Sequence, residues 1–185
     1  MKELSLNILD ITENSLKAGA TLVTVLIEES ESLMKISIED DGVGMTGEVL
    51  SSVENPFYTT RKTRKVGMGI PLFRFAAEQT GGDLKISSRH IDEFPDAHGT
   101  LVCATFNKAH IDFTPLGDVI STVVTLIQGH PDRDFLFIHK SERGTVTLDT
   151  RELRSVLEEI PLDTFEVLSW IRENLTEQYE SIKQI

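Results

Sequence analysis

Residues 33–45 read Leu-Met-Lys-Ile-Ser-Ile-Glu-Asp-Asp-Gly-Val-Gly-Met, so a strand pattern runs directly into an acidic loop with two glycines. Apolar and polar side chains alternate up to residue 39, as in a half-buried β-strand. Asp40 then stands at the strand end, and Gly42 and Gly44 allow the backbone to approach a flat ligand closely. An aspartate here can accept a hydrogen bond from an exocyclic amino group such as that of adenine. Taken alone, a tight acidic turn explains the same residues.

The segments around this stretch predict a layered domain. Residues 3–17 carry apolar side chains at the three-and-four spacing of a half-buried helix, and residues 21–28 form a hairpin pattern with the next strand. Further along, the patterns predict a short helix from residue 46, a helix over 69–81, and strands over 83–89 and 100–108. We therefore expect residues 1–108 to form an α/β (α+β) two-layer sandwich, with helices over one face of a mixed or antiparallel sheet.

Residues 109–185 predict a small C-terminal α+β appendage, whose role the sequence leaves open. The expected elements are a helix that starts at Thr114 and Pro115 and ends at Gly129, a hairpin over 134–148, and two helices opened by the capping boxes Asp149 with Glu152 and Asp163 with Glu166, the second ending near Tyr179. Most apolar side chains of these helices are expected in a core, and a role in recognition or dimer formation is a further hypothesis.

The composition is that of a globular protein, with 39% hydrophobic and 26% charged residues. The single cysteine, Cys103, excludes an internal disulfide and a cysteine-based zinc cluster, and its apolar neighbours predict a core residue. The net charge of −12 opposes binding to nucleic acid or to a phospholipid surface. No apolar run approaches the ~20 residues that cross a bilayer, and the start of the chain lacks the features of a signal peptide, so we expect a cytoplasmic protein with no membrane partner.

Two polar side chains on the first predicted helix suggest a cation site. Asp10 and Asn14 are four residues apart and share a helix face. Magnesium usually takes one or two oxygen ligands from protein and completes its shell with phosphates and water, so Asn14 is a candidate magnesium ligand. Asp10 is then a candidate general base that orients or deprotonates a water. The competing interpretation is a solvated polar face of an amphipathic helix.

Gly67-Met68-Gly69 leads into a helix with Pro71 in its first turn, where free backbone amides and the helix dipole can meet an anion. Two glycines alone are a weak signal. In an otherwise acidic chain, however, four cations come immediately before them, namely Arg61, Lys62, Arg64 and Lys65. Together these residues predict a phosphate-binding loop, with a solvated basic loop as the alternative.

Taken in order, five segments resemble the motifs of the GHKL superfamily, which is named for gyrase, the Hsp90 chaperone, histidine kinases and MutL. They are Glu13 to Ala20 (N box), Asp40 to Met45 (G1 box), Asn55 to Arg61 (the Pro-Phe-Phe-Thr-Thr-Lys segment of histidine kinases), Gly67 to Leu72 (G2 box) and the pair Gly99-Thr100. Each is common by itself, but five in this order over residues 4–107 are a specific signal. The resemblance implies the Bergerat fold of histidine-kinase-like ATPases, with ATP and Mg²⁺ as ligands.

The resemblance also implies a role for each matching residue. It implies that Asn14 holds magnesium against the triphosphate, and that Asp40 binds the adenine amino group, with Thr100 sharing that network through a water. Gly42 and Gly44 would admit the base, and Met45 would pack on it. The phosphates would be met by Gly67, Met68 and Gly69, with Thr60 in the nucleotide-binding lid and with Arg61, Lys62 and Lys65 as candidates for contact with the terminal phosphate, the two lysines as candidate catalytic residues.

Three departures from the family pattern bear on activity. Pro71 replaces the third glycine of the histidine-kinase G2 box, the segment between Thr60 and Gly67 has only six residues, and Asp10 stands where hydrolytic members have the longer glutamate. Three activities are therefore open. They are transfer of the terminal phosphate of ATP to a partner protein in trans, slow magnesium-dependent hydrolysis with Asp10 as base, and an ATP-dependent switch without catalysis.

We favour phosphotransfer in trans. The short lid and the Thr-Thr-Arg sequence resemble histidine kinases, and no phosphoacceptor helix precedes residue 4 of this sequence. The five histidines all follow the G2 box and are expected to be ordinary loop or strand residues; they are His90, His98, His110, His130 and His139. The acceptor of the phosphate and the formation of a homodimer are left open.

Overall fold

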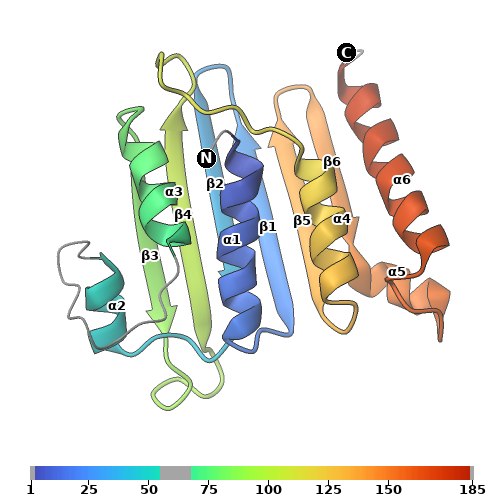
Figure 1. The fold of residues 1–185 in the computed structure, drawn as a ribbon, viewed down its shortest axis with the longest axis horizontal. Coiled ribbons are helices and arrows are strands. Elements are labelled where there is room, and N and C mark those ends of the chain that lie inside the picture. Colours follow the sequence, from blue (N-terminus) through green and yellow to red (C-terminus); the bar gives the residue numbers. More distant parts are fainter. Residues whose placement is uncertain (1–2, 55–67, 184–185) are drawn as a thin grey trace.

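The computed structural model describes residues 3–54 and 68–183, which form one six-stranded mixed sheet with most helices on one face (Figure 1). The strand order is β3-β4-β2-β1-β5-β6. The strands are β1 (Leu22–Glu29), β2 (Leu33–Asp40), β3 (Asp83–Arg89), β4 (Gly99–Asn107), β5 (Asp134–Ser141) and β6 (Gly144–Asp149). The described helices are α1 (Leu4–Lys17), α2 (Gly47–Glu54), α3 (Gly69–Glu78), α4 (Val119–Gly129), α5 (Thr150–Leu157) and α6 (Phe165–Lys183).

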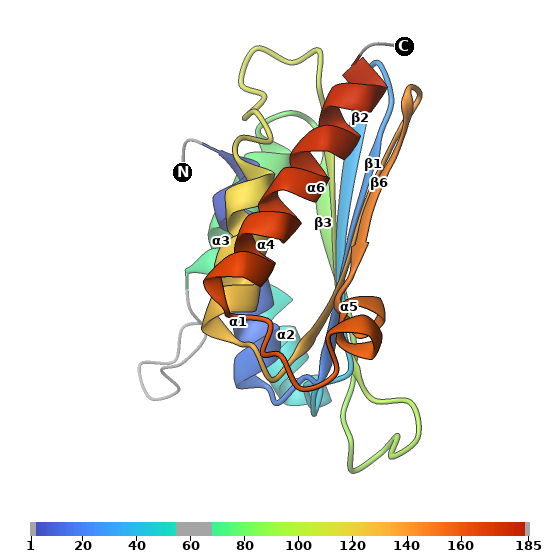
Figure 2. The same ribbon diagram turned by 90° about the vertical axis from the view of Figure 1, so that its right-hand side faces the viewer.

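The first helix and the hairpin form where the sequence predicts them. β1 pairs antiparallel with β2, with Val25 opposite Ile38. The side chains at every second position of both strands are buried, and with the apolar face of α1 they form the centre of the core. Figure 2 shows α1, α3 and α4 together on one side of the sheet. This arrangement confirms the two-layer sandwich with helices over a mixed sheet.

The C-terminal segment extends the same sheet. β5 runs parallel to β1, with Leu22 opposite Asp134, and β6 pairs antiparallel with β5. α4 packs against α1, and α6 packs against α4 and β6. The predicted α+β content of residues 109–185 is therefore present as the outer part of one continuous sheet, while the division into domains at residue 108 stays a prediction.

α4 begins later than the sequence predicts, so the expected start at Thr114 and Pro115 is wrong. The carbonyl oxygens of Pro115 and Leu116 instead accept hydrogen bonds from the first two backbone N–H groups of α1, at 2.9 and 2.8 Å. These N–H groups have no partner within their own helix, so the extended segment satisfies them. Asp118 then caps α4 through a hydrogen bond from the backbone N–H of Ser121 at 2.9 Å.

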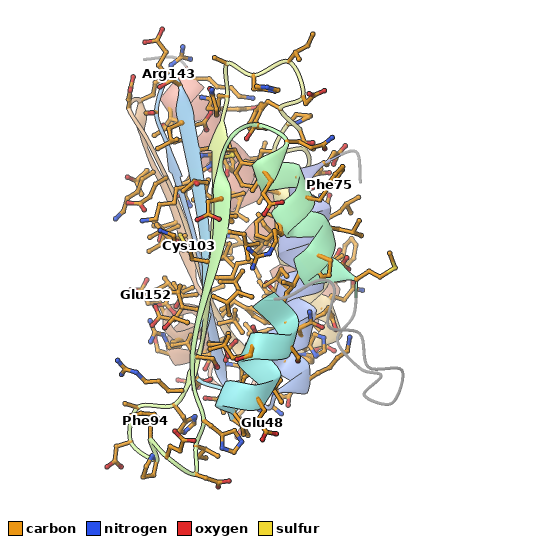
Figure 3. All side chains as sticks on the ribbon, turned by 90° about the vertical axis from the view of Figure 1, so that its left-hand side faces the viewer. Glu48, Phe75, Phe94, Cys103, Arg143 and Glu152 are labelled. Atoms are coloured by element: carbon orange, nitrogen blue, oxygen red, sulfur yellow. The ribbon has the colours of Figure 1, made fainter. Side chains whose placement is uncertain are left out.

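Two smaller expectations also differ. Cys103 is only partly buried, and it lies on the sheet face away from α1 and α3, where Ser37 Oγ donates to its Sγ at 3.6 Å (Figure 3). Its assignment to the core is therefore wrong, because its strand alternation places Val102 and Ala104 on the helix side. α6 continues to Lys183 and does not end near Tyr179. Of the helices described, none is both long and apolar enough to span a membrane.

Candidate functional site

Asp40 lies at the end of β2 and is only 8% exposed. Its Oδ2 accepts a hydrogen bond from Ser15 Oγ at 2.5 Å. Its Oδ1 accepts from the backbone N–H groups of Gly42 at 2.9 Å and Thr100 at 3.2 Å. The sheet register places Thr100 of β4 directly opposite Asp40, and α1 supplies Ser15. Donors from α1, β4 and the following loop therefore hold the carboxylate in one orientation.

The neighbouring carboxylate of Asp41 fastens the loop to the start of β1. It accepts from the backbone N–H groups of Thr21 at 2.7 Å and Leu22 at 2.9 Å, and from the Thr21 hydroxyl. Burial raises the pKa of Asp41, but these hydrogen bonds outweigh burial and hold the pKa below its ordinary value. The charged form of Asp41 therefore anchors the loop at neutral pH.

Two glycines permit close approach of the backbone around this loop. Gly44 has φ +71°, and a Cβ added to it would lie 1.9 Å from the carbonyl oxygen of Arg89. Gly99 has φ +135°, and its Cβ would lie 2.0 Å from the carbonyl oxygen of Asp40. The two glycines are thus needed because they let two backbone segments come into contact where a side chain would not fit, and this contact keeps the loop against the ends of β3 and β4.

A cavity of about 700 Å³ opens beside Asp40, between α1 and the sheet. It brings together five residues that the sequence predicts for the site, namely Asn14, Asp40, Gly44, Met45 and Thr100. Apolar side chains complete the wall, including Ile11, Val53 and Ile70. A concave, largely apolar space with a few fixed polar groups is typical of a small-molecule site.

The start of α3 lies against the polar face of α1. A Cβ added to Gly69 would lie 3.1 Å from Asp10 Cβ and 3.7 Å from Asn14 Nδ2. Met68, the N-cap residue of α3, makes no side-chain capping bond. The first turn of a helix presents backbone N–H groups that can meet an anion. Glu13 points elsewhere, with Oε1 2.9 Å from Nε2 of His130. Asp10 is thus the exposed carboxylate of α1 beside the start of α3.

The remaining predicted site residues fall into two groups. Gly42 and Met68 are described but are not part of the cavity wall: Gly42 contacts the Asp40 carboxylate, and the Met68 side chain is 72% exposed. The others lie outside the described residues; they are Thr60, Arg61, Lys62, Lys65 and Gly67.

Three polar residues of the site were missed from the sequence. Ser15 donates a hydrogen bond to Asp40. Ser88 Oγ accepts a hydrogen bond from the backbone N–H of Met45 and lies 2.8 Å from Thr100 Oγ1. Nδ1 of His98 lies 2.6 Å from the carbonyl oxygen of Gly42. Only Ser15 could have been identified from the sequence, because it is a polar residue on the apolar stripe of α1. A buried hydroxyl there would be costly without a hydrogen-bond partner. Ser88 and His98 come from distant segments, and their roles depend on sheet register.

A metal site made by the protein alone is absent from the described ranges, because no three His, Cys, Asp or Glu side chains there are grouped for coordination. Asn14 offers one amide oxygen at the cavity wall. This donor set suits magnesium only where phosphate oxygens and water supply the other ligands. Asn14 therefore fits the magnesium role that the sequence predicts for it.

Comparison with known proteins identifies the family of this chain. Residues 2–110 match the model of the family described as histidine kinase-, DNA gyrase B-, and HSP90-like ATPase. Sporulation kinase C of Bacillus subtilis (strain 168) is 32% identical over 88 residues, which are 48% of this chain and 20% of that protein. The sensor histidine kinase ZraS of Escherichia coli (strain K12) is 31% identical over 68 residues, 37% of this chain and 14% of that protein. The match thus covers a small share of both kinases.

Among solved structures, the ATPase domain of Aquifex aeolicus MutL complexed with ADP superposes with a TM-score of 0.54 at 16% identity, covering 85% of this chain and 70% of that one. At this identity the likeness concerns the fold. The family match covers more than half of the sequence and includes α1, the hairpin, α3, β3 and β4. The chain belongs to the family of histidine kinase-, DNA gyrase B- and HSP90-like ATPases.

Proposed function

We propose that this chain binds ATP with magnesium in the cavity beside Asp40 and transfers the terminal phosphate to a partner protein in trans. The observation that carries the proposal is the Asp40 carboxylate itself, which is buried, held by three donors and placed at the wall of a cavity of about 700 Å³. A carboxylate fixed in this way is a preorganised acceptor for a neutral donor.

Hydrogen-bond counting supports the adenine assignment. An ionised carboxylate has about four acceptor positions. Oδ1 of Asp40 uses two of them for the N–H groups of Gly42 and Thr100, and Oδ2 uses one for Ser15. One position on Oδ2 is left for an exocyclic amino group. A guanine base presents a carbonyl oxygen at the equivalent place and would meet the carboxylate with repulsion, so we expect ATP to bind in preference to GTP.

The part of the cavity wall formed by Asn14 suits the phosphates. Asn14 lies on the cavity wall, and the start of α3 adjoins the same face of α1. Asn14 would hold magnesium, which when bound would neutralise phosphate charge and orient the triphosphate. Gly67, Lys62, Lys65, Arg61 and Thr60 remain predicted phosphate-side residues outside the described part of the chain.

Transfer in trans is supported by the positions of the histidines. His130 is engaged by Glu13, His139 lies between Glu29 and Tyr179, and His98 contacts the Gly42 carbonyl. His90 and His110 lie beside Asp92 and Asp112. Each is accounted for by a local partner, which favours an acceptor on another protein. We further propose that the chain has no nucleic-acid partner, because the net charge is −12. A cytoplasmic location is also proposed, on the sequence features given above.

Slow hydrolysis is the second candidate. Asp10 is exposed and lies against Gly69, so it can approach a water near the terminal phosphate. An ATP-dependent switch without catalysis uses the same site and differs only in the fate of the phosphate.

The deciding experiment follows ATP labelled at its terminal phosphate, incubated with magnesium and the pure protein, alone and with host extract. Label on a second protein establishes transfer in trans and identifies the acceptor. Label released as inorganic phosphate by the pure protein establishes hydrolysis, and label that stays on ATP in both incubations rules out both reactions.

Two variants test whether the Asp10 carboxylate is the general base of hydrolysis. Asp10→Asn should abolish hydrolysis with little change in ATP affinity. Glu13→Gln is the matched control, because Glu13 is on the same helix and contacts His130, away from the start of α3. Hydrolysis that persists in Asp10→Asn removes Asp10 as the base.

A further inference from the structure

The surface between α5 and α6 is an apolar groove remote from Asp40. It has a volume of about 680 Å³ and lies at the outer edge of the sheet, beyond β6 (Figures 1 and 2). Its wall consists of α5, the start of α6 and the loop between them, with the lining residues Leu153, Val156, Leu157, Ile160, Val167 and Trp170 among them. None of these residues contributes to the cavity beside Asp40.

Large apolar side chains are unusually exposed around this groove. Val156 is 80% exposed, Ile160 54%, Phe165 79% and Trp170 48%. They are four of the twelve exposed large hydrophobic residues of the described chain, and they fall within 15 residues of sequence. Val156, Ile160 and Trp170 line the groove, and Phe165 lies between its lining residues Thr164 and Glu166 in the sequence. Single exposed apolar residues are ordinary, but several that line one groove mark a contact surface.

The charged side chains of the elements that form the groove are mostly acidic, and most of the unpaired ones are carboxylates. Residues 151–173 contain six acidic side chains, and none of the six forms a salt bridge with another described residue; they are Glu152, Glu158, Glu159, Asp163, Glu166 and Glu173. Two of the three arginines of the segment pair with carboxylates: Arg151 with Asp149 at 2.6 Å and Arg154 with Asp134 at 2.8 Å. Arg172 donates to the neutral Ser121 hydroxyl at 3.0 Å and keeps its charge, so the segment remains acidic by six carboxylates to three arginines.

The elements that form the groove therefore carry six exposed carboxylates, which we call its rim, while most of the lining residues are apolar. Glu166 lines the groove itself, and Figure 3 shows Glu152 on the side of the molecule opposite α1 and α3. Thr164 also lines the groove, and its buried Oγ1 has no hydrogen-bond partner among the described residues.

We propose that this groove binds an amphipathic, positively charged helix of a partner protein. The groove would bind the apolar face of such a helix, whose apolar residues recur at positions i, i+3, i+4 and i+7. The unpaired carboxylates of the rim would contact the lysines or arginines of that helix. A second copy of this chain fits poorly, because it would bring an identical acidic rim against this one in a molecule of net charge −12. The groove is separate from the nucleotide cavity, so this proposal stands independently of ATP binding.

The test uses Trp170, the single tryptophan, as the reporter. The full chain is titrated with a tryptophan-free Leu/Lys peptide of about 18 residues with helical leucine spacing, and with the peptide in which every lysine is glutamate. We expect saturable binding of the basic peptide with a blue shift of Trp170 emission, since the indole loses water, and weaker binding at about 0.5 M than at about 0.05 M salt. The acidic peptide should leave the spectrum unchanged.

Substitutions separate the groove from general attraction to an acidic protein. The double variant Val156→Glu, Ile160→Glu should bind the basic peptide at least about tenfold more weakly, because it removes exposed apolar surface. It also makes the protein more negative, so attraction by charge alone would predict stronger binding. The matched control is Ile111→Glu, at a residue that is 95% exposed and far along the chain from the groove, and it should bind as the parent does.

A charge-reversal variant tests the rim. The double variant Glu159→Lys, Glu166→Lys should bind the basic peptide more weakly than the parent does, and it should bind the acidic peptide. The proposal is overturned if both peptides bind the parent equally, if neither does, or if the apolar double variant binds unchanged. It is also overturned if sedimentation shows a dimer of the parent that the Val156→Glu, Ile160→Glu variant loses, because the groove would then belong to a second copy.

Discussion

Ser15 is the residue whose side chain most directly fixes Asp40. It is 6% exposed, and its hydroxyl donates to Asp40 Oδ2 at 2.5 Å. Removing this donor leaves a buried carboxylate with only two backbone partners. We predict that Ser15→Ala lowers the free energy of unfolding by about 1.5–3 kcal/mol, the range for a hydrogen bond to a charged group, as measured by urea unfolding.

The same substitution should weaken ATP binding, since the carboxylate becomes freer to turn. The control is Ser181→Ala, because Ser181 is exposed and its hydroxyl contacts only the Gln178 carbonyl of its own helix. Equal unfolding midpoints for Ser15→Ala and Ser181→Ala would contradict the role given to Ser15.

Gly44 provides a second test at the scale of one residue. Its φ of +71° and the 1.9 Å separation between an added Cβ and the Arg89 oxygen leave no room for alanine. Gly44→Ala should therefore destabilise the protein by about 2 kcal/mol or more and reduce ATP binding, because the loop must move away from β3.

Gly47→Ala is the matched control for this loop. Nothing lies within 4 Å of a Cβ added to Gly47, at the start of α2. Alanine there should be neutral or slightly stabilising in thermal unfolding. A Gly44→Ala protein as stable as the parent would show that the loop tolerates a side chain.

At the scale of elements, the turn after α5 is strained. Glu158 has φ +53° and ψ −103°, and it is the one non-glycine residue of the described chain with positive φ. Glycine adopts such a conformation without steric cost. We predict that Glu158→Gly raises the free energy of unfolding by about 1 kcal/mol, seen as a higher Tm, whereas Glu159→Gly, which relieves no such strain, should not. A lower Tm for Glu158→Gly would contradict the assignment of strain.

Elements with a strong local pattern were predictable from sequence. α1, the β1–β2 hairpin, α3 and the β5–β6 hairpin depend on apolar spacing and on turn residues, and they occur where expected. The start of α4 was not predictable, because the competing partners of residues 115 and 116 are N–H groups of α1 more than a hundred positions away. The late start therefore follows from a tertiary contact that overrides a local capping signal.

Part of the candidate site could be grouped from the sequence, while the roles of its residues stay predictions. Asn14, Asp40, Met45 and Thr100 gather at one cavity as the order of motifs predicts. Ser88 joins them only because β3 pairs with β4, which places Ser88 opposite Thr100. The parallel pairing of β1 with β5 was equally invisible, because no local pattern specifies which strand becomes a neighbour across a crossover.

Over the whole molecule, a buried polar cluster joins the outer helix to the centre of the sheet. His139 of β5 is 4% exposed; its Nε2 lies 3.0 Å from Glu29 of β1 and its Nδ1 lies 2.9 Å from the Tyr179 hydroxyl of α6. Lys108 pairs with Glu29 at 2.6 Å. Burial lowers the pKa of His139, more than Glu29 raises it, to below its ordinary value of 6.5.

The cluster therefore makes stability depend on pH with a defined sign. Below pH 6.5 the unfolded chain takes up a proton that folded His139 resists, so the free energy of unfolding should fall as pH drops through this window and the stability should be complete above it. The pKa of Glu29 is also lowered, so its contribution is lost only below 4.5. Urea unfolding at about pH 7.5 and about pH 5.5 covers the range in which His139 contributes and stays above the range in which Glu29 does.

His139→Gln should reduce this pH dependence while lowering stability at neutral pH, because a titrating group is replaced by a neutral one. An unchanged slope between the two pH values would show that the other histidines account for it. Tyr179 does not titrate in this range, since burial raises its pKa.

Calorimetric titration of ATP with magnesium into the parent and the Asp40→Asn variant, with GTP as the competing ligand, tests the central claim most directly. The parent should bind ATP in preference to GTP, and Asp40→Asn, which replaces one carboxylate oxygen by an amide donor, should lose at least about tenfold in ATP affinity, or about 1.4 kcal/mol. A folded Asp40→Asn protein that binds ATP as tightly as the parent would contradict the placement of adenine at Asp40 and the nucleotide site built on it.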